Sequence, residues 1–111
     1  MILSTAYFPD NFKLILAGVS YNNYYEKLKI LKKQNNLKKV TLLKDVNYSE
    51  WFKILKKGDL GIAFYDQVNT SHRNMAGTSQ KFNNYLLAGI PCLVNKNKDF
   101  IKFNKKYNVL Y

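Results

Sequence analysis

The sequence predicts an α/β fold with three layers, in which helices cover both faces of a mostly parallel sheet. Two features of the 111-residue chain support this prediction. Short, nearly continuous apolar runs are typical of strands buried on both faces. Between them lie longer segments whose apolar residues recur three or four positions apart, as on one face of a helix. Alternating strands and helices of this kind favour a doubly wound parallel sheet.

Five apolar runs account for the strands. We expect strands at residues 12–17, 40–43, 60–65 and 92–94, with a last, short one at 109–111. Gly18 ends the first run, and Gly58 and Asp59 precede the third. Turn residues at the borders of apolar runs are a usual sign of strand ends.

Four segments account for the helices. We expect them at residues 21–33, 49–57 and 79–88, and as a short helix around 100–103. Asn47 or Ser49 is suited to cap the second, and Ser79 the third. Gly89 and Pro91 are expected to end the third helix, because glycine adopts a left-handed C-terminal conformation and proline cannot continue a helix.

The length predicts a single domain over residues 1–111. Residues 1–11 show no clean period, and we expect them to be the tail of a preceding element. Residues 66–77 form a long polar stretch without period, and a loop of this length in a compact domain is usually functional or mobile.

The composition limits the classes of partner. The formal net charge is +11, yet Arg73 is the only arginine among 18 Lys and Arg residues. Arginine is the preferred residue for bidentate contacts to phosphate and bases, so we do not expect a nucleic-acid partner. Abundant Lys, Asn, Tyr and Ile also reflect A/T-rich codons. No apolar run approaches a membrane span and no signal-peptide pattern opens the chain. We therefore expect a cytoplasmic protein, with peripheral contact at the inner face of the membrane.

The start of the 79–88 helix is the strongest candidate site. Unpaired N–H groups of Ser79, Gln80 and Lys81, together with the helix dipole, would attract an anion. The hydroxyls of Thr78 and Ser79 and the Lys81 ammonium would add donors. Asn84, one turn further, could bond sugar hydroxyls. The simpler alternative is an ordinary capped helix with a solvated lysine.

These same residues carry a resemblance to a known family. The pattern from Ser79 to Pro91, S-x-K-x-x-N-Y-L-x-A-G-x-P, resembles the donor-site helix of GT-B glycosyltransferases of the glycosyl transferase group 1 type. KLILAG at 13–18 and GDLGIAFY at 58–65 resemble two strands of that family in the same order. The resemblance implies a Rossmann-like, incomplete C-terminal domain, which in these enzymes holds the nucleotide-sugar donor.

The resemblance also implies roles for individual residues. Thr78, Ser79 and Lys81 would bind the donor diphosphate, and Asn84 the ribose. Asn84 stands where the family usually has Glu, and an amide cannot accept hydrogen bonds as a carboxylate does. Further donor-site candidates are Gly18, Val46, Asp66 and Arg73. No catalytic residue is assigned, because the general base of such enzymes lies in their N-terminal acceptor domain.

The implied activity is transfer of a sugar from a UDP- or GDP-sugar to a glycan or other acceptor, with cell-envelope glycans as one class. The N-terminal acceptor domain is not part of these residues, so we expect the chain alone to be inactive. No metal or other cofactor is expected, since no cluster of His, Cys or carboxylates has metal-ligand spacing. Cys92 is expected to be a buried hydrophobe.

Two alternatives remain open at this stage. The chain could be a non-catalytic module, a truncated or degenerate Rossmann-like domain that binds a protein partner or nothing. It could also be a basic binder of anionic membrane surfaces, through lysines of the 21–33 and 49–57 helices. An incomplete sheet would expose an edge strand or an apolar face, through which two copies could form a homodimer.

Overall fold

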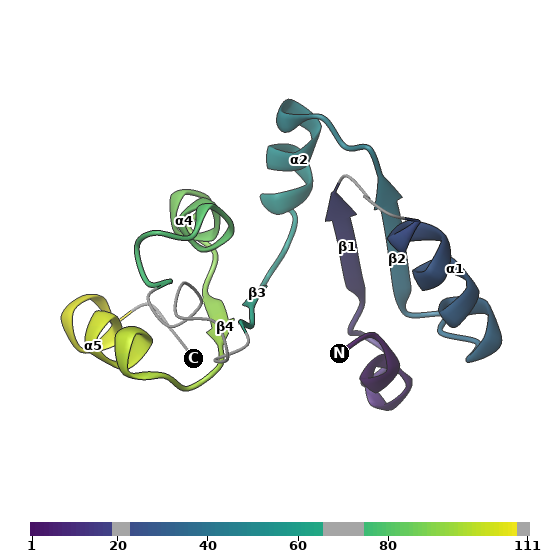
Figure 1. The fold of residues 1–111 in the computed structure, drawn as a ribbon, viewed down its shortest axis with the longest axis horizontal. Coiled ribbons are helices and arrows are strands. Elements are labelled where there is room, and N and C mark those ends of the chain that lie inside the picture. The colour runs from purple at the N-terminus through teal and green to yellow at the C-terminus, as the bar shows by residue number, and fades with distance from the viewer. Residues whose placement is uncertain (19–22, 66–74, 109–111) are drawn as a thin grey trace. The chain divides into compact units, whose positions relative to one another are not determined.

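A computed structural model describes residues 1–18, 23–65 and 75–108. The chain divides into two compact units, residues 1–51 and 52–111 (Figure 1). Each unit is a pair of parallel strands with helices, so the α/β class is confirmed. The described strands pair two by two. That the strands form one continuous sheet with helices on both faces, and that the chain is a single domain, stay predictions.

The first unit is a β-α-β arrangement preceded by a 3-10 helix. The elements are the 3-10 helix Ile2–Tyr7, β1 (Leu14–Gly18), α1 (Tyr24–Gln34) and β2 (Val40–Lys44) (Figure 1). β1 and β2 pair in parallel from Leu14 opposite Val40 to Gly18 opposite Lys44. Leu14, Leu37 and Val40 are the buried apolar residues in the described part of this unit.

Residues 1–11 are tied to this unit rather than irregular. Thr5 in the 3-10 helix is buried, and Lys39 donates a hydrogen bond to the carbonyl of Phe8. Lys39 also lies 3.1 Å from the carboxylate of Asp10. The sequence lacks a helical period here because a 3-10 helix this short needs no amphipathic repeat. That these residues follow a preceding element stays a prediction.

Helix α2 (Tyr48–Leu55) begins where the sequence predicted. The Asn47 side-chain oxygen accepts hydrogen bonds from the Glu50 amide and the Ser49 hydroxyl, each at 3.0 Å. Asn47 rather than Ser49 therefore caps this helix, since its oxygen meets an otherwise unpaired amide of the first turn.

The second unit contains β3 (Gly61–Ala63), α4 (Gln80–Leu87), β4 (Cys92–Val94) and α5 (Lys98–Tyr107). β3 and β4 pair in parallel, with Gly61 opposite Cys92 and Ala63 opposite Val94. β3 is shorter than the predicted 60–65 strand, and α5 is longer than the predicted 100–103 helix. The predicted 109–111 strand lies outside the described residues.

An aromatic core holds the second unit together. Ala63, Phe82, Cys92 and Phe100 are almost fully buried. The Phe82 ring meets Phe100 edge-on at 5.2 Å and Phe103 at 5.3 Å between ring centroids. Edge-to-face pairs at this separation add to the stabilisation from burial alone. Cys92 is confirmed as a buried hydrophobe.

The ends of α4 also follow the sequence. Ser79 caps the start, and Gly89 follows the helix with a φ of +69°, which favours glycine. Among the described residues no helix combines the length and apolar character needed to cross a bilayer.

Candidate functional site

The candidate site lies in the second unit, at the carboxyl ends of β3 and β4. Parallel sheets bind ligands at this edge. Tyr65 follows β3, Asn95 follows β4, and Ser79 begins α4. Their side chains form one connected group of hydrogen bonds.

Asn95 fixes the backbone of Tyr65. Its side-chain oxygen accepts from the Tyr65 amide, and its side-chain nitrogen donates to the Tyr65 carbonyl, both at 2.9 Å. The backbone N–H and the backbone C=O of Tyr65 are thus both hydrogen-bonded to the same side-chain amide. This pairing holds Tyr65 where its own side chain can reach α4.

Tyr65 connects β3 to the start of α4. Its hydroxyl shares a hydrogen bond with the Ser79 hydroxyl. Burial raises the pKa of Tyr65, and the bond to Ser79 opposes that effect. Ser79 is 8% exposed, and its oxygen also accepts from the Phe82 amide at 3.3 Å. Its hydroxyl is therefore engaged within the protein.

Lys81 lies beside this pair. Its ammonium is 4.7 Å from the centre of the Tyr65 ring, a cation–π distance. Lys81 is exposed as a residue, but partial desolvation of its ammonium lowers its pKa, while the influence of Cys92 opposes this. A positive charge with less surrounding water interacts more strongly with an anion.

The turn before α4 is held by backbone and side-chain contacts. The amides of Thr78 and Ser79 donate to the Met75 carbonyl at 3.3 and 3.1 Å. The Ala76 amide donates to the Asp99 carboxylate at 2.7 Å, and Asn83 donates to the Gly77 carbonyl at 3.0 Å. The expectation that the Ser79 amide is unpaired is therefore wrong, because the tight turn directs it inward.

Two amides remain at the helix start. No acceptor in the described part of the chain meets the N–H groups of Gln80 and Lys81. With the helix dipole and the Lys81 ammonium, they leave this end of α4 electropositive. Thr78 is exposed next to them. The arrangement can stabilise negative charge, which is the chemistry expected of an anion site.

Asn84 and Cys92 lie deeper. Asn84 is 8% exposed on α4, so most of its side chain is covered by protein. Cys92 in β4 is fully buried, and desolvation raises the pKa of its thiol to about 11, with the positive charge of Lys81 opposing the shift. Neither side chain presents an open surface at the helix start.

The remaining predicted donor-site residues lie elsewhere. Gly18 ends β1, and its carbonyl accepts from the Asp45 amide at 3.2 Å, next to Val46. These residues form the carboxyl edge of the first unit. Asp66 and Arg73 lie outside the described residues. The structure thus places Lys81 and Asn84 on α4, Ser79 at its cap and Thr78 in the turn before it, whereas Gly18 and Val46 belong to the other unit.

Three participants were missed by the sequence reasoning: Tyr65, Asn95 and Asp99. Tyr65 and Asn95 each come directly after an apolar run, at the edge where ligands bind, and that position is the signal that could have identified them. Asp99 gave no such signal, because its acceptor role depends on the Met75–Gly77 turn in space.

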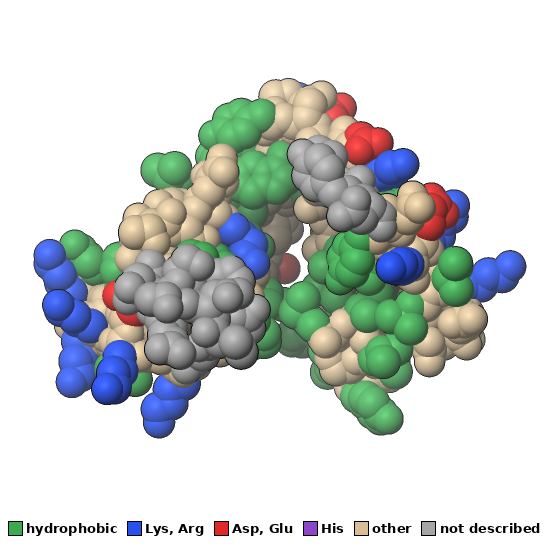
Figure 2. Space-filling model, in the orientation of Figure 1, with side chains coloured by type: hydrophobic (Ala, Val, Ile, Leu, Met, Phe, Trp, Pro, Cys, Tyr) green, Lys and Arg blue, Asp and Glu red, His purple; other side chains and the backbone are tan. Residues whose placement is uncertain are grey.

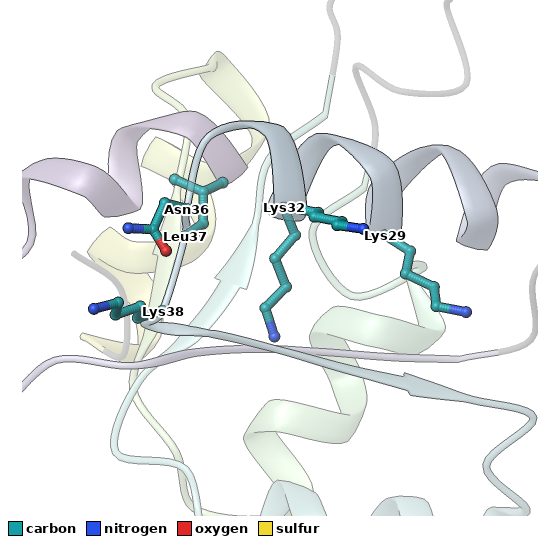
Figure 3. A pocket seen from close by; sticks show the side chains of 6 residues that line it. Lys29, Lys32, Asn36, Leu37 and Lys38 are labelled. Carbon is teal, nitrogen blue, oxygen red and sulfur yellow. The ribbon is translucent and has the colours of Figure 1, made fainter.

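The first unit carries a separate basic hollow of about 320 Å³ at the end of α1. Its lining residues are Lys29, Lys32, Lys33, Asn36, Leu37 and Lys38. Figure 3 shows the side chains of Lys29 and Lys38 pointing apart, with Lys32 between them. They therefore do not converge on one small anion.

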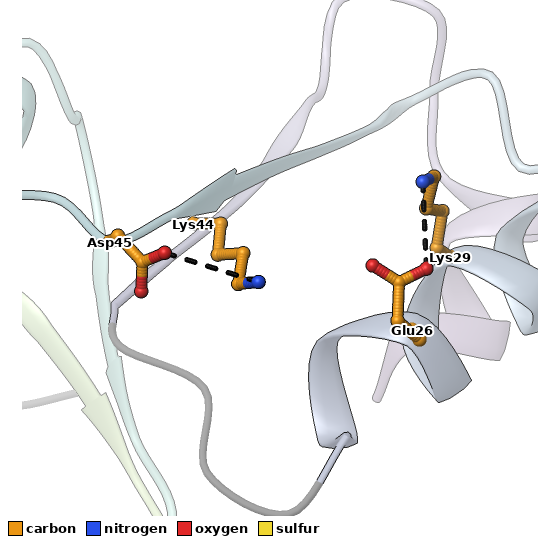
Figure 4. A network of polar contacts seen from close by, with 4 residues as sticks. All are labelled: Glu26, Lys29, Lys44 and Asp45. Carbon is orange, nitrogen blue, oxygen red and sulfur yellow. Dashed lines mark hydrogen bonds and ion pairs between the residues drawn. The ribbon is translucent and has the colours of Figure 1, made fainter.

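Two ion pairs of the first unit are long and exposed to solvent. The Lys29 Nζ lies 3.5 Å from a carboxylate oxygen of Glu26, and the Lys44 Nζ lies 4.0 Å from one of Asp45 (Figure 4). Exposed pairs of this kind contribute little to stability. Among the described residues no group of three His, Cys, Asp or Glu side chains could hold a metal ion. Metal-free function stays a prediction.

No protein-family model, curated protein or solved structure matches the chain. The likeness to GT-B glycosyltransferases therefore rests on the residues quoted above, and the function that follows is a proposal.

Proposed function

We propose that the chain is the donor-binding part of a glycosyltransferase that moves a sugar from a nucleotide-sugar to a glycan or other acceptor. On this proposal the chain is an incomplete Rossmann-like domain of the GT-B type, working in the cytoplasm. The observation that carries it is the position of Lys81 beside the Ser79-capped start of α4, at the carboxyl edge of β3 and β4.

The proposed chemistry is electrostatic. A departing nucleoside diphosphate gains negative charge, and donors fixed in advance around it lower the barrier to transfer. The amides of Gln80 and Lys81 and the Lys81 ammonium would supply those donors without a metal. Ser79, whose oxygen is engaged by Tyr65 and Phe82, would act by fixing the helix start. Thr78 is exposed and would contact the diphosphate directly.

Other parts of the donor are assigned with fewer contacts. Asn84 is proposed for the ribose, and reaching it would require its covered amide to become accessible. Gly18 and Val46 are proposed for the nucleoside end, and Asp66 and Arg73 for the sugar or phosphate. The acceptor and the general base would come from an N-terminal domain.

A binding titration of the full chain tests the proposal. Calorimetry with UDP, GDP, inorganic pyrophosphate and inorganic phosphate should show saturable binding of one nucleotide, and weaker binding of the phosphates. Lys81→Met should weaken nucleotide binding about 10- to 100-fold, the usual effect of losing one charged hydrogen bond. Lys53→Met removes an exposed lysine from α2 and serves as the charge-matched control.

A second variant isolates the role of Tyr65. Tyr65→Phe keeps the ring beneath Lys81 but removes the bond to Ser79, so the loss of affinity should be smaller than for Lys81→Met. Equal affinity in wild type and Lys81→Met would contradict the assigned role of Lys81. Failure of the folded wild type to bind any nucleotide would favour the non-catalytic module instead.

A further inference from the structure

Helix α5 carries a straight row of positive charge on its outer side. Lys98, Lys102 and Lys105 are exposed and lie four and three residues apart, on one stripe of the helix. We name these three residues the α5 basic row. Figure 2 shows Lys and Arg side chains gathered along the edge of the molecule where Figure 1 places α5.

The opposite side of α5 is anchored in the protein. Phe100 is 2% exposed and packs on Phe82, as does Phe103. The aromatic core therefore fixes the rotation of α5 and keeps the basic row facing outward. Ile101, 40% exposed, lies beside Lys98 and Lys105 on this outer side, and it is the one apolar residue that α5 itself contributes there.

The residues that the structure describes do not neutralise the charge of the row. Asp99 is the only acidic residue of α5, and its carboxylate accepts from the Ala76 amide. None of the three lysines forms an ion pair within the described residues. Lys98 also sits in the first turn, where the helix dipole disfavours a cation. Helix stability therefore does not account for it.

We infer that the α5 basic row binds an anionic phospholipid surface. A row on an outward-facing helix can touch a plane with all its charges at once. Clustered lysines are attracted to anionic bilayers by about 1 kcal/mol each, which corresponds to about fivefold in affinity per residue. Ile101 adds shallow apolar contact at the same plane. The interaction is independent of the proposed donor site.

The row is less suited to other anions. Nucleic-acid binding usually adds arginine forks or aromatic rings on which bases stack, and the outer side of α5 has neither. A single phosphate would need converging donors, whereas these lysines lie along a line. The hollow of the first unit is concave and offers no comparable plane.

Vesicle flotation with the full chain tests the inference. Wild type should bind vesicles of 30% phosphatidylglycerol in phosphatidylcholine at low salt, but not pure phosphatidylcholine. Roughly 0.5 M salt should release it, because screening then acts over a few ångströms. The triple variant Lys98→Gln, Lys102→Gln, Lys105→Gln should bind about 100-fold more weakly. Circular dichroism checks that each variant folds.

A matched variant tests whether binding depends on the position of the three lysines or only on the net charge of the chain. Lys13→Gln, Lys38→Gln, Lys44→Gln removes three exposed lysines of the first unit that lie outside the 21–33 and 49–57 helices, and it should stay within about fivefold of wild type. Three outcomes would overturn the inference: no binding by wild type, equal losses in both triple variants, or complete displacement from vesicles by an equal charge concentration of duplex DNA.

Discussion

The two units use the same order of elements but begin their helices differently. In the first unit α1 follows β1, and its cap residue Asn23 has a left-handed conformation without a side-chain hydrogen bond to the helix. In the second unit α4 likewise follows β3 and precedes β4 along the chain. Its cap residue Ser79, however, is extended, and the Ser79 hydroxyl oxygen accepts a hydrogen bond from the Phe82 amide. The order of the elements alone therefore does not determine how a helix start is capped, because the two caps differ in backbone conformation and in side-chain hydrogen bonding.

The buried apolar residues of the two units also differ in type. In the described part of the first unit the buried apolar residues are the aliphatic Leu14, Leu37 and Val40. The second packs Phe82 against Phe100 and Phe103 directly beneath the candidate site. On the proposed function, this aromatic packing would orient the amides at the helix start before a ligand arrives and so lower the entropic cost of binding.

The largest expected effect comes from removing the centre of that aromatic layer. Phe82→Ala should lower the free energy of unfolding by about 3–5 kcal/mol, because a large cavity replaces a fully buried ring. Urea denaturation followed by circular dichroism measures the loss. Ile101→Ala, at an exposed position of α5, is the control and should change stability by less than about 1 kcal/mol.

Amide hydrogen exchange of the Phe82 variant sharpens the comparison. Exchange should accelerate in β4 and α5 more than in β1 and β2, since the lost contacts belong to the second unit. A stability loss no greater than that of the control would show that the aromatic layer is not what holds the second unit together.

Exchanging the helix caps gives an intermediate effect. Ser79→Ala should destabilise by about 1 kcal/mol, because the first turn of α4 loses its side-chain acceptor and Tyr65 loses its partner. Asn23→Gly should change stability by less than about 0.5 kcal/mol, since glycine adopts the left-handed conformation readily and no cap bond is lost. Thermal unfolding of both variants tests this. Equal losses would contradict the difference between the two helix starts.

A further effect, confined to alkaline conditions, concerns the pH dependence of stability. The pKa of Cys92 rises from 9.0 to about 11 on folding. Below pH 9 the thiol is protonated in both states and its contribution is constant. Between these values the unfolded thiol ionises first, so stability falls as pH rises through the window. The lowered pKa of Lys81 acts with the opposite sign just below its ordinary value of 10.5.

Comparing wild type with Cys92→Ala separates the two groups. From about pH 8 to about pH 10.5, the urea midpoint should fall by more in wild type than in the variant. Parallel pH profiles would show that burial of the thiol does not contribute to the pH dependence.

Much of this fold follows from local rules. Apolar runs and capping residues predicted four of the described strands and all of the described α-helices to within a few residues. Ser79, Asn47 and Gly89 took the positions that their chemistry favours. The length of β3 was overestimated because Leu60 and Phe64 are apolar yet 45% and 48% exposed, and composition alone cannot distinguish an exposed from a buried apolar residue.

The site was less predictable than the elements. Ser79 and Lys81 were identified because a helix start is visible in a sequence. The contacts from Asn95 to Tyr65 and from Asp99 to Ala76 join residues 30 and 23 positions apart, and no local pattern encodes them. The unpaired state of a backbone amide likewise depends on the exact course of a turn, which explains the error at Ser79.

The pairing of Asn95 with Tyr65 bears on how this small sheet sets its own length. The Asn95 side chain imitates a peptide group and supplies one more rung beyond the paired backbones of β3 and β4. Its main chain is thereby released to turn toward Asn97 and α5. The short amide of asparagine carries its donor and its acceptor on two separate atoms, whereas aspartate lacks the donor and leucine lacks both. The place where the sheet ends therefore depends on the Asn95 side chain rather than on the strand propensity of the neighbouring residues.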